Sequence, residues 1–126
     1  MNKFSHIDDN GNVKMVDVTD KIPSVRIARA EGKIILGEET INNIQNNELP
    51  KGNVLTTAKI AGIYAAKKTG DTIPMCHQLN LSFIDIKFEI NTGEIVIHSI
   101  VKTREATGVE MEALTAVSAA ALTIYD

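Results

Sequence analysis

The feature that most constrains the fold is a strict alternation between residues 82 and 90. Apolar side chains stand at every second position from Ile84 to Ile90, and charged side chains stand between them. Because successive side chains of a strand point to opposite faces, this pattern predicts a strand that is buried on one face only. Asn-Thr-Gly at 91–93 predicts a turn, and residues 94–102 are expected to return as the partner strand.

Two further strand candidates precede this hairpin. Residues 15–18 read Met-Val-Asp-Val and predict a short strand, whereas residues 25–36 predict a long or interrupted strand with a polar break at 31–33. Residues 1–13 are polar and contain the turn signal Asp-Asp-Asn-Gly. We therefore expect a loose, flexible arm at the N-terminus.

Two helices are expected in the middle of the chain. Isoleucines at helical spacing within residues 38–47 predict a short helix, which a loop follows. Asn53 is a good N-cap, because its side-chain oxygen can accept from the next turn. The helix after it is expected to run to about residue 68 and to end at Gly70, with a loop over 71–80.

The last helix is expected to begin at 107–110, where Thr-Gly-Val-Glu matches a capping box, and to continue through Tyr125. No glycine, proline or basic turn closes it, so we expect that the sequence stops inside this helix. The order of elements favours an α+β fold, with helices packed on one face of an antiparallel sheet. A length of 126 residues predicts a single domain over 1–126.

Composition narrows the class of protein. A formal charge of −3 and an aromatic content of 4% disfavour nucleic-acid binding. No apolar run approaches the ~20 residues that span a bilayer, and the N-terminus lacks an apolar signal core. The single cysteine excludes an intrachain disulfide framework and fits a reducing compartment. We expect a cytoplasmic protein with no nucleic-acid or membrane partner.

Three segments could carry chemistry, although phosphate-loop, CxxC and metal-ligand patterns are absent. Lys51 directly precedes a helix N-terminus, where free N–H groups help to bind phosphate; the alternative is a solvated loop lysine. Cys76 and His77 share a short loop between apolar residues; the alternative is a partly buried histidine with a structural partner. Glu112 has no evident structural role, but acids in a first turn are ordinary partners of the helix dipole.

Together these segments resemble the family of molybdenum cofactor biosynthesis protein C, the cyclic pyranopterin monophosphate synthases. The resemblance covers nearly the whole chain in order and spacing. It is carried by MVDV at 15–18, KGNV at 51–54, AKIAGI at 58–63, IPMCH at 73–77, TGVEMEALT at 107–115 and ALTIYD at 121–126.

The resemblance implies a ferredoxin-like α+β fold and a hexamer assembled from dimers. It implies a lyase that converts 3′,8-cyclo-7,8-dihydro-GTP, supplied by an upstream radical enzyme, to cyclic pyranopterin monophosphate with loss of pyrophosphate. No resident cofactor or metal is implied, although Mg²⁺ can accompany the triphosphate. By motif, Asp126 is the catalytic acid and Lys51 a catalytic or phosphate-facing lysine. The residues that contact substrate are Met75, Cys76, His77, Met111 and Glu112.

The chain departs from the family pattern at three places. Gln78 stands where proline is usual, and Ala106 stands where a lysine often precedes the Thr-Gly-Val-Glu block. The family also continues past the aspartate with a lysine and a further tail, which are absent after Asp126. An alternative function is therefore a non-catalytic, oligomeric nucleotide-binding fragment that lacks the catalytic tail.

Helix geometry adds an expectation about assembly. Lys51 and His77 flank a helix of about 24 Å, and Glu112 and Asp126 are separated by about 21 Å along another. Each pair is too distant to converge in one chain. We therefore expect a site shared between subunits, with Lys51 and Asp126 contributed by different chains.

Overall fold

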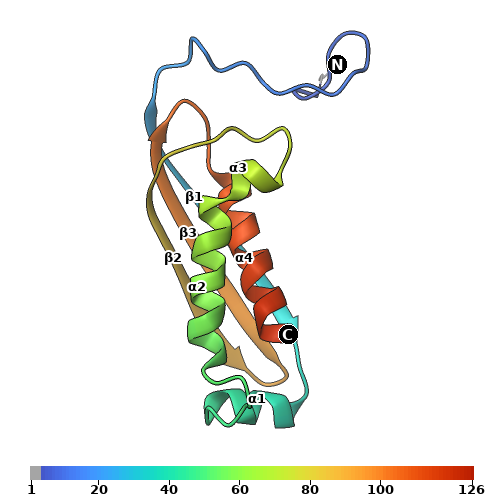
Figure 1. Cartoon of the computed structure of the whole chain (residues 1–126), viewed down its shortest axis with the longest axis vertical. Helices are drawn as coiled ribbons and strands as arrows, with labels where there is room; N and C mark the ends of the chain where they lie inside the picture. Colours follow the sequence, from blue (N-terminus) through green and yellow to red (C-terminus); the bar gives the residue numbers. More distant parts are fainter. Residues whose placement is uncertain (1–3) are drawn as a thin grey trace.

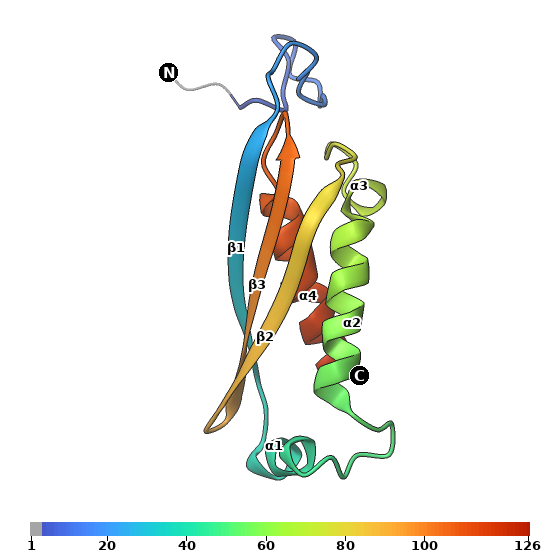
Figure 2. The ribbon, with the colours of Figure 1, turned by 90° about the vertical axis from the view of Figure 1, so that its left-hand side faces the viewer.

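The computed structural model of the protein describes residues 4–126. Within this range the elements are β1 (Ser24–Ile35), α1 (Glu38–Gln45), α2 (Val54–Lys67), α3 (Thr69–Thr72), β2 (Leu81–Asn91), β3 (Glu94–Glu105) and α4 (Glu110–Tyr125). The strands form an antiparallel sheet in the order β1-β3-β2, and α2 and α4 lie side by side on one face of it (Figure 1 and Figure 2). The expected α+β, ferredoxin-like architecture is confirmed.

β2 and β3 form the hairpin that the alternation predicts. Ile90 pairs with Ile95 beside the turn, where Gly93 takes a φ of 74° that a residue with a side chain rarely adopts. Ile86 and Ile97 are buried beneath the helices, as expected for the apolar side of the pattern. Within residues 4–126, no helix covers the other face of the sheet (Figure 2).

α2 and α4 approach each other closely because small residues build their contact. Ala58 on α2 and Ala116 on α4 are fully buried. A Cβ at Gly62 would overlap the side chain of Ile86 and would lie 2.9 Å from the carbonyl oxygen of Ala116. The helix pair is therefore packed at backbone distance and forms a stiff layer along the length of the sheet.

Residues 15–18 do not form the expected strand. They belong to an arm that passes across one end of the molecule instead of running beside the sheet (Figure 1). A strand needs a hydrogen-bonding neighbour, and four alternating residues do not provide one. Elsewhere in the arm, Ile7 and Val13 form an isolated bridge around a turn whose N–H groups bond to Asp8. The first part of the predicted flexible arm, residues 1–3, lies outside the described residues.

The predicted end of α2 at Gly70 is wrong. α2 ends at Lys67, and Gly70 lies inside the short helix α3. The Thr69 hydroxyl donates to the Ala65 carbonyl at 3.0 Å and helps to turn the chain onward. A Cβ at Gly70 would overlap the side chain of Gln78, so the glycine serves a close contact and not a helix terminus.

The predicted capping box at the start of α4 is also wrong. α4 begins at Glu110 with Val109 as its N-cap, and no side chain caps it. Thr107 stands two residues too early, because Val109 is fully buried and its burial fixes where the helix starts. The carboxylate of Glu110 lies against Gly108 and does not reach back to Thr107.

None of the helices in the described part of the chain is both long enough and apolar enough to cross a membrane.

Candidate functional site

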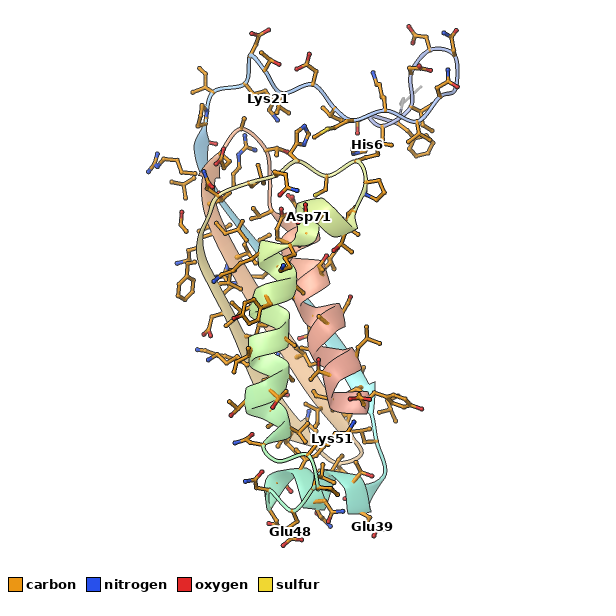
Figure 3. All side chains as sticks on the ribbon, in the orientation of Figure 1. His6, Lys21, Glu39, Glu48, Lys51 and Asp71 are labelled. Carbon is orange, nitrogen blue, oxygen red and sulfur yellow. The ribbon has the colours of Figure 1, made fainter. Side chains whose placement is uncertain are left out.

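The candidate residues fall into two groups at opposite ends of the α2–α4 layer. One group lies on the loop after α3 and on the first turn of α4, beneath the arm. The other consists of Lys51, before α2, and Asp126, after α4. Figure 3 shows Lys51 near α1, whereas His6 and Lys21 of the arm lie at the opposite end.

A cavity of about 600 Å³ occupies the end beneath the arm. Three segments form it: the arm, the loop after α3 and the first turn of α4. Of the predicted substrate-contacting residues, it is lined by Met75, Cys76, His77 and Met111. Three of these come from one loop and the fourth from a helix start more than thirty residues later, so the fold has brought two predicted motifs together.

His77 is held by the arm. Its Nε2 lies 2.6 Å from the carbonyl oxygen of Val16. Since a carbonyl oxygen only accepts, Nε2 donates and carries the proton, which leaves Nδ1 of the neutral ring as the acceptor. His77 thus has a structural partner and still presents a hydrogen-bonding atom. The bond also gives residues 15–18 a role in the site that a strand would not have had.

Burial governs the acid–base character of this end. Burial, and then the charge of Glu112, raise the pKa of the Cys76 thiol, so Cys76 is a neutral group near pH 7 and not a thiolate nucleophile. Burial, followed by the charge of Glu110, also raises the pKa of Glu112. Glu112 is 2% exposed and its Oε1 has no hydrogen-bond partner among residues 4–126. It lies behind the cavity lining and not in it.

Gln78, the departure from the family's proline, ties the loop to the preceding helix. Its Nε2 donates to Oδ1 of Asp71 at 2.7 Å, and its side chain packs on Gly70. The loop that presents Cys76 and His77 is therefore braced by a side chain where a proline ring would have stiffened the backbone.

Lys51 and Asp126 form an ion pair at the other end. Lys51 Nζ lies 2.9 Å from Oδ2 of Asp126 and donates also to its main-chain oxygen at 3.3 Å. The hydrogen bond from Lys51, and then its charge, lower the pKa of the Asp126 carboxyl. Asp126 is consequently a carboxylate at neutral pH. The side chains of Lys51 and Asp126 are 69% and 80% exposed, so both can reach a ligand.

A second cavity, of about 400 Å³, adjoins this ion pair between the loop before α2 and the end of α4. Asn53 accepts from the Thr56 N–H, so part of the N-terminal hydrogen-bonding capacity of α2 is already used. Lys51 itself is paired with Asp126.

The structure corrects one expectation about assembly. Lys51 and Asp126 are in contact within one chain, so a shared site does not require them to come from different chains. Distances along each helix do not include the effect of packing between helices. Because α2 packs antiparallel on α4, the start of α2 lies beside the end of α4 (Figure 1). The two ends remain separate, as predicted for Lys51 and His77.

Sequence reasoning missed several residues that line the larger cavity. His6 lies in the predicted loose arm, residues 1–13, Lys21 lies beyond that arm in a stretch with no predicted role, and Glu110 was assigned to the capping box. The Met-Val-Asp-Val stretch was the available signal for the arm, because the family resemblance already included it. Nothing in the spacing of Glu110 distinguishes a capping acid from a cavity acid.

In the described residues, no group of three or more His, Cys, Asp or Glu side chains is arranged to hold a metal ion.

Comparison with known proteins gives a consistent result. The sequence model of the MoaC family matches residues 15–126. A molybdenum cofactor biosynthesis bifunctional protein of Chlorobaculum tepidum is 61% identical over 98% of this chain, which spans 40% of that protein. Cyclic pyranopterin monophosphate synthases of Desulfatibacillum aliphaticivorans and Geobacillus thermodenitrificans are 53% and 48% identical over the whole chain, which spans 80% of each.

Proposed function

The chain belongs to the MoaC family, and we propose that it is a cyclic pyranopterin monophosphate synthase of molybdenum cofactor biosynthesis. Its substrate is 3′,8-cyclo-7,8-dihydro-GTP, and pyrophosphate is the second product. The observation that carries the proposal is the two-part site, with a cavity for the fused ring at one end and an exposed Lys–Asp pair at the other. The alternative of a non-catalytic fragment is not supported, because relatives named synthases match the whole chain.

The larger cavity suits the ring system of the substrate. Met75 and Met111 supply soft, apolar contacts for a flat ring, while His77 offers Nδ1 as an acceptor. Burial, and then the charge of Glu110, raise the pKa of Glu112, so this carboxyl is easier to protonate than an exposed one. These groups bind and orient the ring, and the neutral thiol of Cys76 adds a further contact.

Lys51 and Asp126 suit the phosphate chemistry. A ribose hydroxyl attacks the α-phosphorus, the bond to the bridging oxygen breaks, and pyrophosphate leaves. Asp126, held as a carboxylate, accepts protons as a general base during the ring opening and closure. Lys51 stabilises the negative charge that develops on the leaving pyrophosphate.

We assign the reaction to the phosphorus–oxygen lyases and place the protein in the cytoplasm. No resident cofactor is needed for these steps, and any Mg²⁺ arrives bound to the triphosphate of the substrate. The direct test is incubation of the purified chain with the cyclised GTP. Release of pyrophosphate together with a pterin product is expected, and neither product would form if the chain were a binding module only.

A second copy of the chain completes the site in this proposal. The outward side of α4 carries an exposed apolar stripe, with Leu122 71% and Tyr125 79% exposed. Met111 and Tyr125 each stand seven positions from Ser118, and Leu114 and Leu122 each stand four positions from it. The stripe is therefore symmetric about Ser118, which is the arrangement that a two-fold contact between identical helices requires.

Such a contact joins the two ends of the site. If two α4 helices pack antiparallel about Ser118, Met111 of one subunit lies near Tyr125 of the partner subunit. The cavity of one chain then faces Lys51 and Asp126 of the partner subunit. Three such dimers would form the hexamer that the family resemblance implies.

Mixing of inactive variants tests this arrangement. Lys51→Ala and His77→Ala chains, dissociated, mixed in equal amounts and reassembled, should regain about a quarter of the wild-type rate, because half the dimers carry one intact site. The matched control is a mixture of Lys51→Ala and Asp126→Ala, which should stay inactive because these residues share one half-site. Recovery in the control, or none in the first mixture despite confirmed subunit exchange, would contradict the arrangement.

A further inference from the structure

Glu110 has no role in the proposed chemistry, yet its side chain is well placed for one. Among the described residues that line the larger cavity, it is the one carboxylate. Its side chain is exposed, and no hydrogen bond or ion pair joins it to another residue in the range 4–126. Gly108 leaves room for this carboxylate against the backbone at the entry to α4.

A second observation marks the same corner as a place for a ligand. Glu112, the residue after the cavity-lining Met111, is buried with Oε1 unpartnered in the described part of the chain. A buried polar atom without a partner is costly, and native structures normally satisfy such atoms. Glu110, in the lining of the 600 Å³ cavity, and the buried Glu112, two positions further along α4, thus both have unused hydrogen-bonding capacity.

We propose that Glu110 recognises the 2-amino-pyrimidinone edge of the guanine-derived ring, an inference that rests on the proposed function. This edge presents two adjacent donors, N1–H and an N–H of the 2-amino group. An ionised carboxylate offers two acceptor oxygens in the matching geometry. Lys21, which the arm contributes to the cavity lining, can only donate hydrogen bonds. It therefore cannot recognise an edge that itself presents two donors. Glu110 therefore determines specificity for guanine-type over hypoxanthine-type rings.

Binding of uncyclised nucleotides isolates this role from catalysis. The full chain is titrated calorimetrically with GTP and with ITP, which lacks the 2-amino group. The wild type should bind GTP at least about tenfold more tightly, the scale of one hydrogen bond to a charged group. Glu110→Gln should reduce this discrimination by weakening GTP binding more than ITP binding, because ITP shares N1–H but lacks the 2-amino group that the second carboxylate oxygen binds. Glu39→Gln, which alters a first-turn acid of α1, is the matched control and should behave as the wild type.

Several outcomes would overturn the assignment. A wild type that binds both nucleotides equally, or neither, has no preformed recognition of this edge. A Glu110→Gln variant that weakens both nucleotides equally would assign Glu110 to an ion pair, for example with Lys51 of the partner subunit. Pyrophosphate release from the cyclised substrate is measured separately, so the proposed function can stand when this inference fails.

Discussion

At the cavity end of the molecule, the carboxyl of Glu112 is 2% exposed, whereas at the other end the carboxylate of Asp126 keeps 80% of its side-chain exposure. Burial raises the pKa of Glu112, and a lysine lowers the pKa of Asp126. The same functional group is thus harder to ionise at one end of the molecule and easier to ionise at the other. The two settings differ in burial, in hydrogen bonding and in the nearest charge.

The two ends also differ in how their side chains are held in place. The cavity is enclosed by three segments of one chain and is braced by the bonds of His77 and Gln78. The Lys51–Asp126 pair is open, and exposed pairs of this kind contribute little to stability. One end is therefore a cavity with braced walls, and the other is an exposed ion pair.

The largest effect is expected for Lys51→Ala. Loss of this charge should reduce pyrophosphate release by about 100-fold, because removing one charge-stabilising donor costs about 2–3 kcal/mol in the transition state. The melting temperature should not change, since the side chain is exposed and its ion pair is on the surface. Unchanged turnover would remove Lys51 from the chemistry, and a large drop in melting temperature would make its role structural.

A smaller effect is expected for Gly62→Ala, which acts on the layer between the two ends. The added methyl group meets the carbonyl of Ala116 at 2.9 Å and overlaps Ile86, so the helices must separate. We expect destabilisation by about 1–3 kcal/mol, measured by urea unfolding. Gly37→Ala is the control, since nothing lies within 4 Å of a Cβ there and its φ is −68°. Equal stability of both variants would show that the contact between α2 and α4 accommodates the added methyl group without strain.

A smaller effect again is expected for Glu112→Gln, and it depends on pH. The pKa of Glu112 is raised in the folded state, so the folded protein binds the proton more tightly than the unfolded chain does. The stability contributed by this group is complete below its unfolded pKa of about 4.3 and is lost as pH rises through the folded value. Glu112→Gln, which cannot ionise, should gain in melting temperature over the wild type as pH rises from 4 to 8.

For Asp126→Asn, at the other end of the molecule, we expect the opposite dependence of stability on pH. A lowered pKa contributes stability above the unfolded value and loses it as pH falls, so this variant should not gain on the wild type at high pH. Because the pair is exposed, its effect on the melting temperature should be close to zero. Parallel pH profiles for the two variants would show that burial does not distinguish the two carboxyls.

Much of the fold could be predicted because its signals are local and long. The alternation from Ile84 to Ile90 spans most of β2, and the turn at Gly93 allows few other arrangements. The failures involve short segments whose structure depends on distant partners. Residues 15–18 have a β-like pattern, but the carbonyl of Val16 bonds to His77, sixty-one positions away.

The candidate site was predictable in composition and not in arrangement. The resemblance supplied Lys51, Asp126 and the loop around His77, but it did not say which of them share an end of one chain. That information lies in the packing of α2 against α4, which puts residue 51 beside residue 126. The place of Glu110 in the cavity could not be predicted, because it depends on the burial of Val109. One valine between a glycine and an acid does not indicate that burial.

The close contact of α2 with α4 restricts how this chain can vary in length. One residue added within α2 would turn everything beyond it by about 100° and advance it by about 1.5 Å. Gly62 would then no longer face Ala116, and the loop that carries His77 would rotate away from the arm. Alignments with relatives extend to 128 and 130 positions against 126 residues here, so they contain gaps. We expect those insertions in the connections at either end of the helices, where added length leaves the packing of α2 on α4 unaltered.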